Sequence, residues 1–254
     1  MIAEIEHHGR RFRVDLGRPI DLSLPLHAGE GRLRAWYVDP VRMEPVVMGD
    51  RTFTVSAGAP VNFRNVFVNP HGHGTHTESV GHLDAGITPV GGLLDRFFFT
   101  AEVVSLRPEQ RRAPDGRTDL VITLEQLRSV LDERPREALV LRTLPNAAGK
   151  DTRDWCGSNP AYLQSTATAW LRSIGVKHLL VDLPSVDREE DGGVLAAHHA
   201  FWDFPATVDT TRTITELLHV PDAVPDGRYL LELQLAHWMN DAAPSRPVLY
   251  ALLP

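Results

Sequence analysis

Residues 69–82, which read Asn-Pro-His-Gly-His-Gly-Thr-His-Thr-Glu-Ser-Val-Gly-His, constrain this chain more than any other stretch. Four of its 12 histidines and a glutamate fall between His71 and His82. An even scatter would place about half a histidine there. Three glycines and a proline disfavour a helix and favour a tight loop, whose bends aim imidazoles at a common point. The segment predicts a metal site, with a histidine-rich surface loop as the alternative.

The spacing of the histidines favours the metal site. His76 and Glu78 are two residues apart, so on an extended segment both side chains leave the same face and can hold a divalent ion between them. His82 shares that parity but lies beyond Gly81. It can therefore lie near the ion without binding it, where a histidine suits proton transfer.

The pattern His-Gly-Thr-His-x-Glu-x-x-Gly-His resembles the signature of the metal-dependent cyclase/hydrolase family that includes bacterial kynurenine formamidase and isatin hydrolase. The family pattern is His-x-Gly-Thr-His-x-Asp-x-Pro-x-His, in which the first two histidines and the Asp bind metal and the last histidine is the acid/base group. The resemblance implies that His76 and Glu78 are metal ligands and that His82 shuttles protons.

The chain departs from the family pattern at three positions. Glu78 replaces the usual Asp, and Gly81 stands where the family usually has proline. Gly72 occupies the position of the first ligand histidine, so His71 or His73 must take that role. We favour His71, because the side chain of His73 has the opposite parity from the family's ligand.

Two further clusters resemble other parts of the family. A histidine pair follows residues 182–187, which read Asp-Leu-Pro-Ser-Val-Asp. The resemblance implies that His198, the first of the pair, binds a second metal. The alternative for His198 is a core or capping role. Asp187 either orients a histidine or forms an Asx turn.

Glu216 lies among apolar residues, where a metal would neutralise its charge. In the family a glutamate in such a context binds or bridges metals, whereas an exposed helix face is the alternative.

Composition limits the other functional classes. With 254 residues, 43% of them hydrophobic, we expect one domain over residues 1–254. The sequence has no signal peptide pattern and no apolar run of membrane-spanning length, so we expect a cytoplasmic protein that does not associate with a membrane. Cys156 is the single cysteine, which excludes an internal disulfide. The net charge of −7 argues against a basic surface that would bind nucleic acid. A small molecule or a second copy of the chain remains as partner.

The periodicity of the chain predicts alternating strands and helices. We expect strands over residues 11–16, 20–26, 61–68, 97–106, 138–141, 178–182, 229–235 and 248–253. Helices are expected after Thr123 and over residues 162–174, whereas residues 27–60 are irregular and residues 107–117 form a solvated linker. The resemblance implies an α/β fold, a mixed sheet or partly closed β-barrel flanked by helices, of the cyclase-like swivelling β/β/α type, in a homodimer or higher homo-oligomer.

The expected function follows from the ligand chemistry and the resemblance. Histidine and carboxylate donors without thiolates suit Zn²⁺ or Mn²⁺, as one or two ions. The ligand set is His71, His76, Glu78, His198 and Glu216, with His82 as acid/base. The best expectation is hydrolysis of an aryl formamide such as N-formylkynurenine. The alternatives are hydrolysis or cyclisation of a cyclic amide or lactone, and a non-catalytic ligand-binding homologue.

Overall fold

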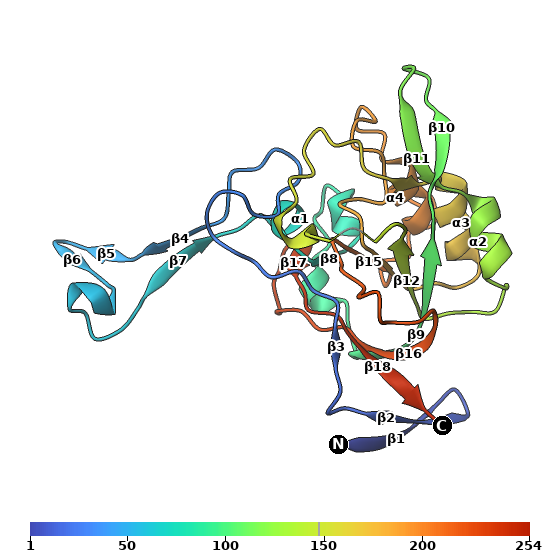
Figure 1. Cartoon of the computed structure of the whole chain (residues 1–254), viewed down its shortest axis with the longest axis horizontal. Helices are drawn as coiled ribbons and strands as arrows, with labels where there is room; N and C mark the ends of the chain where they lie inside the picture. The colour runs from blue at the N-terminus through green and yellow to red at the C-terminus, as the bar shows by residue number, and fades with distance from the viewer. Residues whose placement is uncertain (147) are drawn as a thin grey trace.

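A large mixed sheet forms the centre of the computed structural model, which describes residues 1–146 and 148–254 (Figure 1). The sheet has 11 strands in the order β1-β2-β18-β16-β9-β12-β14-β15-β8-β17, with β3 beside β18. Its strands are β1 Ile2–His7, β2 Arg10–Asp15, β3 Ile20–Asp21, β8 His76–Glu78, β9 Phe98–Leu106, β12 Ala138–Thr143, β14 His178–Val181, β15 Thr213–Glu216, β16 Gly227–Glu232, β17 Ala242–Pro244 and β18 Val248–Leu253.

Parallel pairing is confined to the centre of this sheet. Strands β9, β12, β14 and β15 run parallel, whereas their neighbours on both sides pair antiparallel. In β12, Leu139 and Leu141 pack on one face and Ala138 and Val140 on the other, all almost fully buried. The apolar runs predicted at residues 138–141 and 178–182 therefore are central strands covered on both faces.

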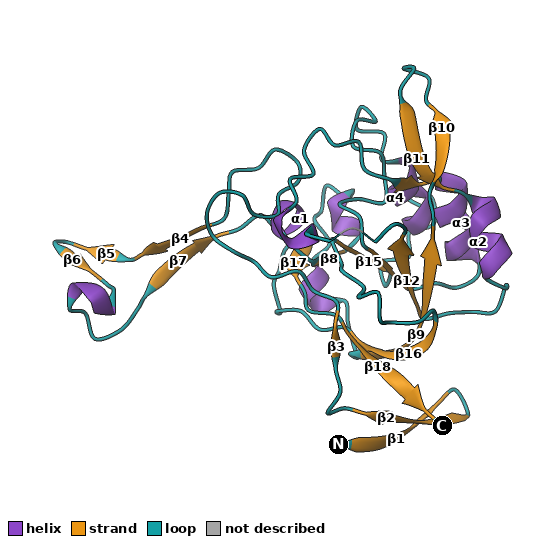
Figure 2. Cartoon of the chain, in the orientation of Figure 1, coloured by secondary structure: helices purple, strands orange, loops and turns teal. Residues whose placement is uncertain are grey.

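Three helices cover one face of the central strands (Figure 2). The chain forms α1 Pro70–His73, α2 Leu124–Val130, α3 Ser165–Ser173 and α4 Ala196–Trp202, and the 3₁₀ turns Val55–Ala57, Val80–His82, Val90–Gly92 and Lys150–Thr152. As predicted, Thr123 caps α2, where its side chain and that of Gln126 bond reciprocally to the backbone. None of the described helices has the length and hydrophobicity needed to cross a membrane.

The sequence prediction of residues 162–174 as one helix was wrong at its start. Tyr162–Leu163 form β13, which pairs with β11 (Thr118–Ile122), and α3 begins only at Ser165. The predicted linker over residues 107–117 was also wrong. Its residues Glu109–Arg112 form β10, which pairs antiparallel with β11 around a turn in which Gly116 adopts a positive φ of 86°.

A two-stranded arm projects from the body of the molecule, at the left of Figure 1. It consists of β4 (Arg42–Pro45) paired with β7 (Arg64–Phe67), and of β5 (Val47–Met48) paired with β6 (Arg51–Thr52). All four residues of β7 are exposed. The segment expected to be irregular thus contains strands, but they lie outside the core. Strand β7 leads directly into the histidine-rich segment.

Candidate metal centre

The histidine-rich segment begins with a single helical turn, α1, instead of the fully non-helical loop that its glycines predicted. Pro70 occupies the first turn, and the side-chain oxygen of Asn69 accepts a hydrogen bond from the backbone N–H of Gly72 at 3.1 Å. Proline at this position and asparagine at the N-cap both favour a helix start. The turn carries His71 and sets it above the strand that follows.

Strand β8 carries His76 and Glu78 on one face, as their spacing predicted. Both side chains are fully buried. His76 lies directly opposite Glu216 in the antiparallel pairing of β8 with β15, and its Nε2 is 3.5 Å from Glu216 Oε2. Its Nδ1 donates to the carbonyl of Gly74 at 2.9 Å. The free lone pair of His76 is therefore on Nε2, facing Glu216.

His198 reaches the same point from α4. Its Nδ1 donates to Asp187 Oδ2 at 2.6 Å, and its Nε2 lies 3.0 Å from Glu78 Oε1 and 3.7 Å from Glu216 Oε1. Asp187 also accepts the backbone N–H groups of Ala197 and His198. Of the two roles open to Asp187 from the sequence, the structure shows the contact with a histidine. The carboxylate fixes both the helix start and the ring.

Asp241 is the residue of this cluster that the sequence reasoning missed. Its Oδ2 is 3.0 Å from His71 Nε2, while His71 Nδ1 is 3.2 Å from Glu78 Oε2. Asp241 directly precedes β17, which pairs with β8, and its carbonyl accepts the N–H of Ser79 at 2.9 Å. No local motif marks Asp241, because its position depends on pairing between strands far apart in the chain.

His82 lies at the more open side of the cluster. Its side chain is 30% exposed, and its Nδ1 is 3.4 Å from Asp241 Oδ2 and 4.0 Å from Glu78 Oε2. The ring centroids of His82 and His71 are 4.5 Å apart. This partial exposure allows proton exchange with solvent, which the buried histidines lack.

Two neighbouring histidines have other contacts. His73 Nδ1 accepts the N–H of Asn69 at 2.8 Å, and its Nε2 donates to the carbonyl of Asp39 at 2.7 Å. Both nitrogens of His73 are thus used by the backbone, and of the two alternatives His71 is the one in the cluster. His199 Nδ1 contacts the carbonyl of Phe204 instead, outside the cluster.

The carboxylates of the cluster favour positive charge. Burial by itself would lower the pKa of His71, but Asp241 and Glu78 outweigh it and raise that pKa to about 10. Likewise, Asp187 and Glu78 outweigh burial and hold the pKa of His198 well above its usual value. Burial would raise the pKa of Glu78, yet the nearby His82 and His198 hold it well below its usual value. Protons on imidazoles balance the carboxylates, and a divalent cation can replace them.

The donor set fits such a cation. Among the described residues, neither His76 Nε2 nor Glu78 Oε2 has a contact with hydrogen-bond geometry, although both are buried and His71 Nδ1 lies 3.2 Å from Glu78 Oε2. Buried polar atoms are normally paired, so two orphans facing one cluster indicate a missing ligand. Donor atoms of His71, His76 and Glu78 lie within 4.8 Å of one another, as do those of Glu78, His82 and His198.

Comparison with known proteins gives consistent matches. The family model described as "Putative cyclase" matches residues 20–188. A kynurenine formamidase from Bordetella avium is 31% identical over 230 residues, which span 86% of this chain and 99% of that protein. The solved structure of a potential metal-dependent hydrolase with cyclase activity superposes with a TM-score of 0.66 at 17% identity, covering 93% and 99% of the two chains. Isatin hydrolase A from Labrenzia aggregata gives 0.65 at 15% identity, covering 93% and 94%.

Proposed function

Because the chain belongs to the putative cyclase family, we propose that it is a metal-dependent hydrolase of an amide-type C–N or ester-type C–O bond. The family match confirms the resemblance seen in the sequence. Our specific proposal is hydrolysis of an aryl formamide such as N-formylkynurenine. The similarity to a kynurenine formamidase over nearly the full length of that relative supports this choice.

The proposed ligands are His76, Glu78, His198 and Glu216, with His71 as the fifth. One observation carries this proposal: each of the three histidines has one nitrogen bonded to a fixed oxygen and the other directed at Glu78 or Glu216. The fixed oxygens belong to Gly74, Asp187 and Asp241. Such outer partners set the tautomer of metal-binding histidines. Nitrogen and oxygen donors without thiolate suit Zn²⁺ or Mn²⁺, as one or two ions.

A bound ion would act as a Lewis acid, polarising the scissile carbonyl and making water more acidic. The chain's own residues then manage the protons. Asp241 orients His82 through Nδ1, which leaves Nε2 to take a proton from the attacking water and to return it to the departing nitrogen. General acid/base catalysis of this kind contributes roughly 10² to 10⁴ in rate. Because His82 is 30% exposed, its proton can also be exchanged with solvent.

The test combines metal content with turnover. Protein loaded with Zn²⁺ or Mn²⁺ and freed of excess ion is assayed for bound metal and for release of formate from N-formylkynurenine. We expect Glu78→Ala and His76→Ala to lose metal and activity together. We expect His82→Ala to keep its metal and to lose about 10² or more in kcat.

Two adjacent histidines provide a matched comparison for the first ligand. We expect His71→Ala to lower the metal content per chain and His73→Ala to leave it unchanged. If neither variant loses metal, His71 is not a ligand. Turnover of a lactone or cyclic amide in place of the formamide would keep the hydrolase and replace its substrate. Undiminished ligand affinity in His82→Ala with no turnover of any of these compounds would favour a binding protein.

We also infer that the chain forms a homodimer or higher homo-oligomer through its arm. Val47, Met48, Val61, Phe63 and Val66 are each more than half exposed there. Several large apolar side chains exposed on one two-stranded arm favour an interaction site. A second copy is the partner that the family resemblance implies.

A further inference from the structure

A pocket distinct from the metal centre lies near the amino ends of β9, β12 and β14. Its volume is about 640 Å³, within the usual range for small-molecule sites. The β1–β2 hairpin, the start of β12 and the residues before β14 contribute to its walls. Lys177 lines it just before β14, whereas Asp187 follows β14 on the way to the metal centre. Four strand residues span about 13 Å, so the two sites are separate.

The charge of this pocket is opposite to that of the whole chain. Six cationic side chains line it, against the two carboxylates of Glu102 and Glu137. The cations are Arg10, Arg96, Arg134, Arg136, Lys177 and Arg228. With the lining histidines neutral, six minus two gives the lining alone a net charge of +4, whereas the chain carries −7. Outside the lining, Asp132 pairs with Arg134 and Arg136, and Asp209 pairs with Lys177. A concave surface lined by one sign of charge concentrates ions of the other sign.

Both carboxylates are already engaged by the protein. Glu102 accepts from Arg136 Nε at 2.5 Å. Glu137 accepts from Arg96 at 2.6 Å and from both the N–H and the hydroxyl of Thr100 at 2.8 Å. Burial would raise the pKa of Glu137, but Thr100 and His7 outweigh it and lower that pKa to about 2. Neither carboxylate is left to neutralise the remaining cations.

His7 and His8 converge on Glu137 with spacing that would also suit a metal ion. The surroundings disfavour one. Arg96 occupies Glu137 Oε1, and Thr100 fills Oε2, so a divalent ion would have to displace charge-assisted hydrogen bonds beside further arginines. The triad serves instead to fix the floor of the pocket.

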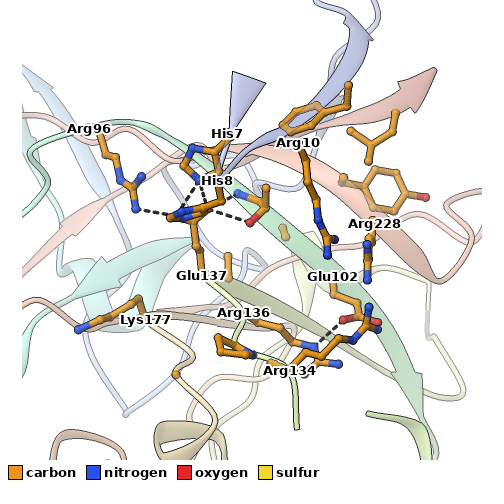
Figure 3. Close-up of a pocket in the computed structure, with 18 residues that line it drawn as sticks. His7, His8, Arg10, Arg96, Glu102, Arg134, Arg136, Glu137, Lys177 and Arg228 are labelled. Atoms are coloured by element: carbon orange, nitrogen blue, oxygen red, sulfur yellow. Dashed lines mark hydrogen bonds and ion pairs between the residues drawn. The ribbon is translucent and has the colours of Figure 1, made fainter. Parts of the chain in front are cut away.

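Arg10 and Arg228 are the lining cations that have no polar partner among the described residues. Among the described residues neither guanidinium has a hydrogen bond or an ion pair, and both extend into the hollow in Figure 3. Arg228 lies directly across the β9–β16 pair from Glu102, but that carboxylate has turned to Arg136. Phe12 and Leu252, which belong to one apolar cluster, supply apolar wall beside them.

We propose that this pocket binds a small organic anion, with a carboxylate or phosphate held by Arg10 and Arg228 and an apolar body against Phe12 and Leu252. Planar guanidinium groups bind either oxyanion through paired N–H donors. No sequence motif marks this site, because its residues are contributed by separate strands.

Binding is measured by calorimetry with four probes: benzoate, phenyl phosphate, inorganic phosphate and uncharged benzamide. We expect saturable binding of benzoate or phenyl phosphate that weakens with added salt, and no binding of benzamide. The stronger of the two aryl probes identifies the oxyanion. Inorganic phosphate shows whether the apolar body contributes.

Variants separate this pocket from the metal centre. We expect Arg10→Gln combined with Arg228→Gln to weaken binding at least tenfold. Arg13→Gln, on the same hairpin but outside the pocket lining, should match wild type. Because all three side chains are exposed, the melting temperatures should be equal.

Three outcomes would overturn the proposal. They are no saturable binding of either aryl anion by wild type, binding that survives in the double variant, and equal weakening by Arg13→Gln. If the double variant changes the oligomeric state while binding persists, the pocket is an interface between copies and the proposal also fails. None of these outcomes bears on the hydrolase, which has its own assay.

Discussion

Replacing Asp187 by asparagine is predicted to weaken metal binding without unfolding the protein. The carboxylate holds His198 Nδ1 at 2.6 Å and accepts two backbone N–H groups at the start of α4. An asparagine keeps one acceptor oxygen, but it removes the charge and offers an N–H₂ group where the second oxygen was. The His198 ring can then rotate, or carry its proton on Nε2 in place of Nδ1, and either change removes the metal-binding nitrogen.

The size of the effect follows from the contact that is lost. A hydrogen bond to a charged group contributes about 1.5–3 kcal/mol, and the His198 side chain is only 2% exposed, so water does not replace it. At 1.4 kcal/mol per factor of ten, affinity for Zn²⁺ or Mn²⁺ should fall between about tenfold and a hundredfold.

Competition with a chelator of known affinity measures this change. Asp191→Asn is the matched control, because Asp191 lies on the same loop and accepts the N–H groups of Gly193 and Leu195, away from the cluster. Its affinity should equal that of wild type. An Asp187→Asn protein that melts like wild type and binds the ion within twofold of wild type would refute the proposed role of His198.

Four other predictions concern stability and assembly. Chelation of the ion should lower the melting temperature, since an ion present at a hundred times its Kd contributes about 2.7 kcal/mol; an unchanged melting curve would argue against a bound ion. Burial lowers the pKa of His178 from 6.5 to about 4. Between pH 6.5 and 4 the unfolded chain therefore binds more protons than the folded protein. The free energy of unfolding should fall by about 3 kcal/mol as the pH drops through that window. Denaturant titrations should show His178→Gln losing this dependence. Lys150→Met leaves the buried Asp182 without the cation that lies 2.6 Å from it. In denaturant titrations this variant should lower the free energy of unfolding by about 3–5 kcal/mol. The double variant Lys150→Met with Asp182→Leu should recover most of that loss. Light scattering should show Phe63→Ser with Phe67→Ser as a monomer and wild type as an oligomer.

The central strands and the helices near them were predictable because their signals are local. The apolar runs at residues 138–141 and 178–182 are long enough to require burial on both faces, and Thr123 is followed by the residues of a capping box. The closing pair of β16 and β18 also follows the predicted strands. These elements support the predicted mixed α/β sheet.

In the arm, β7 falls within the strand predicted over residues 61–68. The other short strands of the arm and β10 escaped prediction. A strand with one buried face alternates apolar and polar residues, but β5 and β6 are exposed throughout and β10 nearly so, so they show no such alternation. Pairing in these hairpins is visible only in three dimensions.

The candidate site divides in the same way. His76, Glu78, His198 and Glu216 carried recognisable motifs, and the structure brings all four together. Asp241 carried none. It joins His71 and His82 across 170 and 159 residues of sequence, and only the pairing of β17 with β8 places it there.

The arm is joined to the proposed metal centre by a very short connection. Strand β7 ends at Phe67, and only Val68 and Asn69 separate it from the helical turn that holds His71. Anything that grips the arm therefore restrains one side of the metal centre. If the proposed second copy binds the arm and restrains His71, thermodynamic reciprocity requires that metal binding at His71 strengthen that contact, so subunit affinity and metal affinity would rise and fall together.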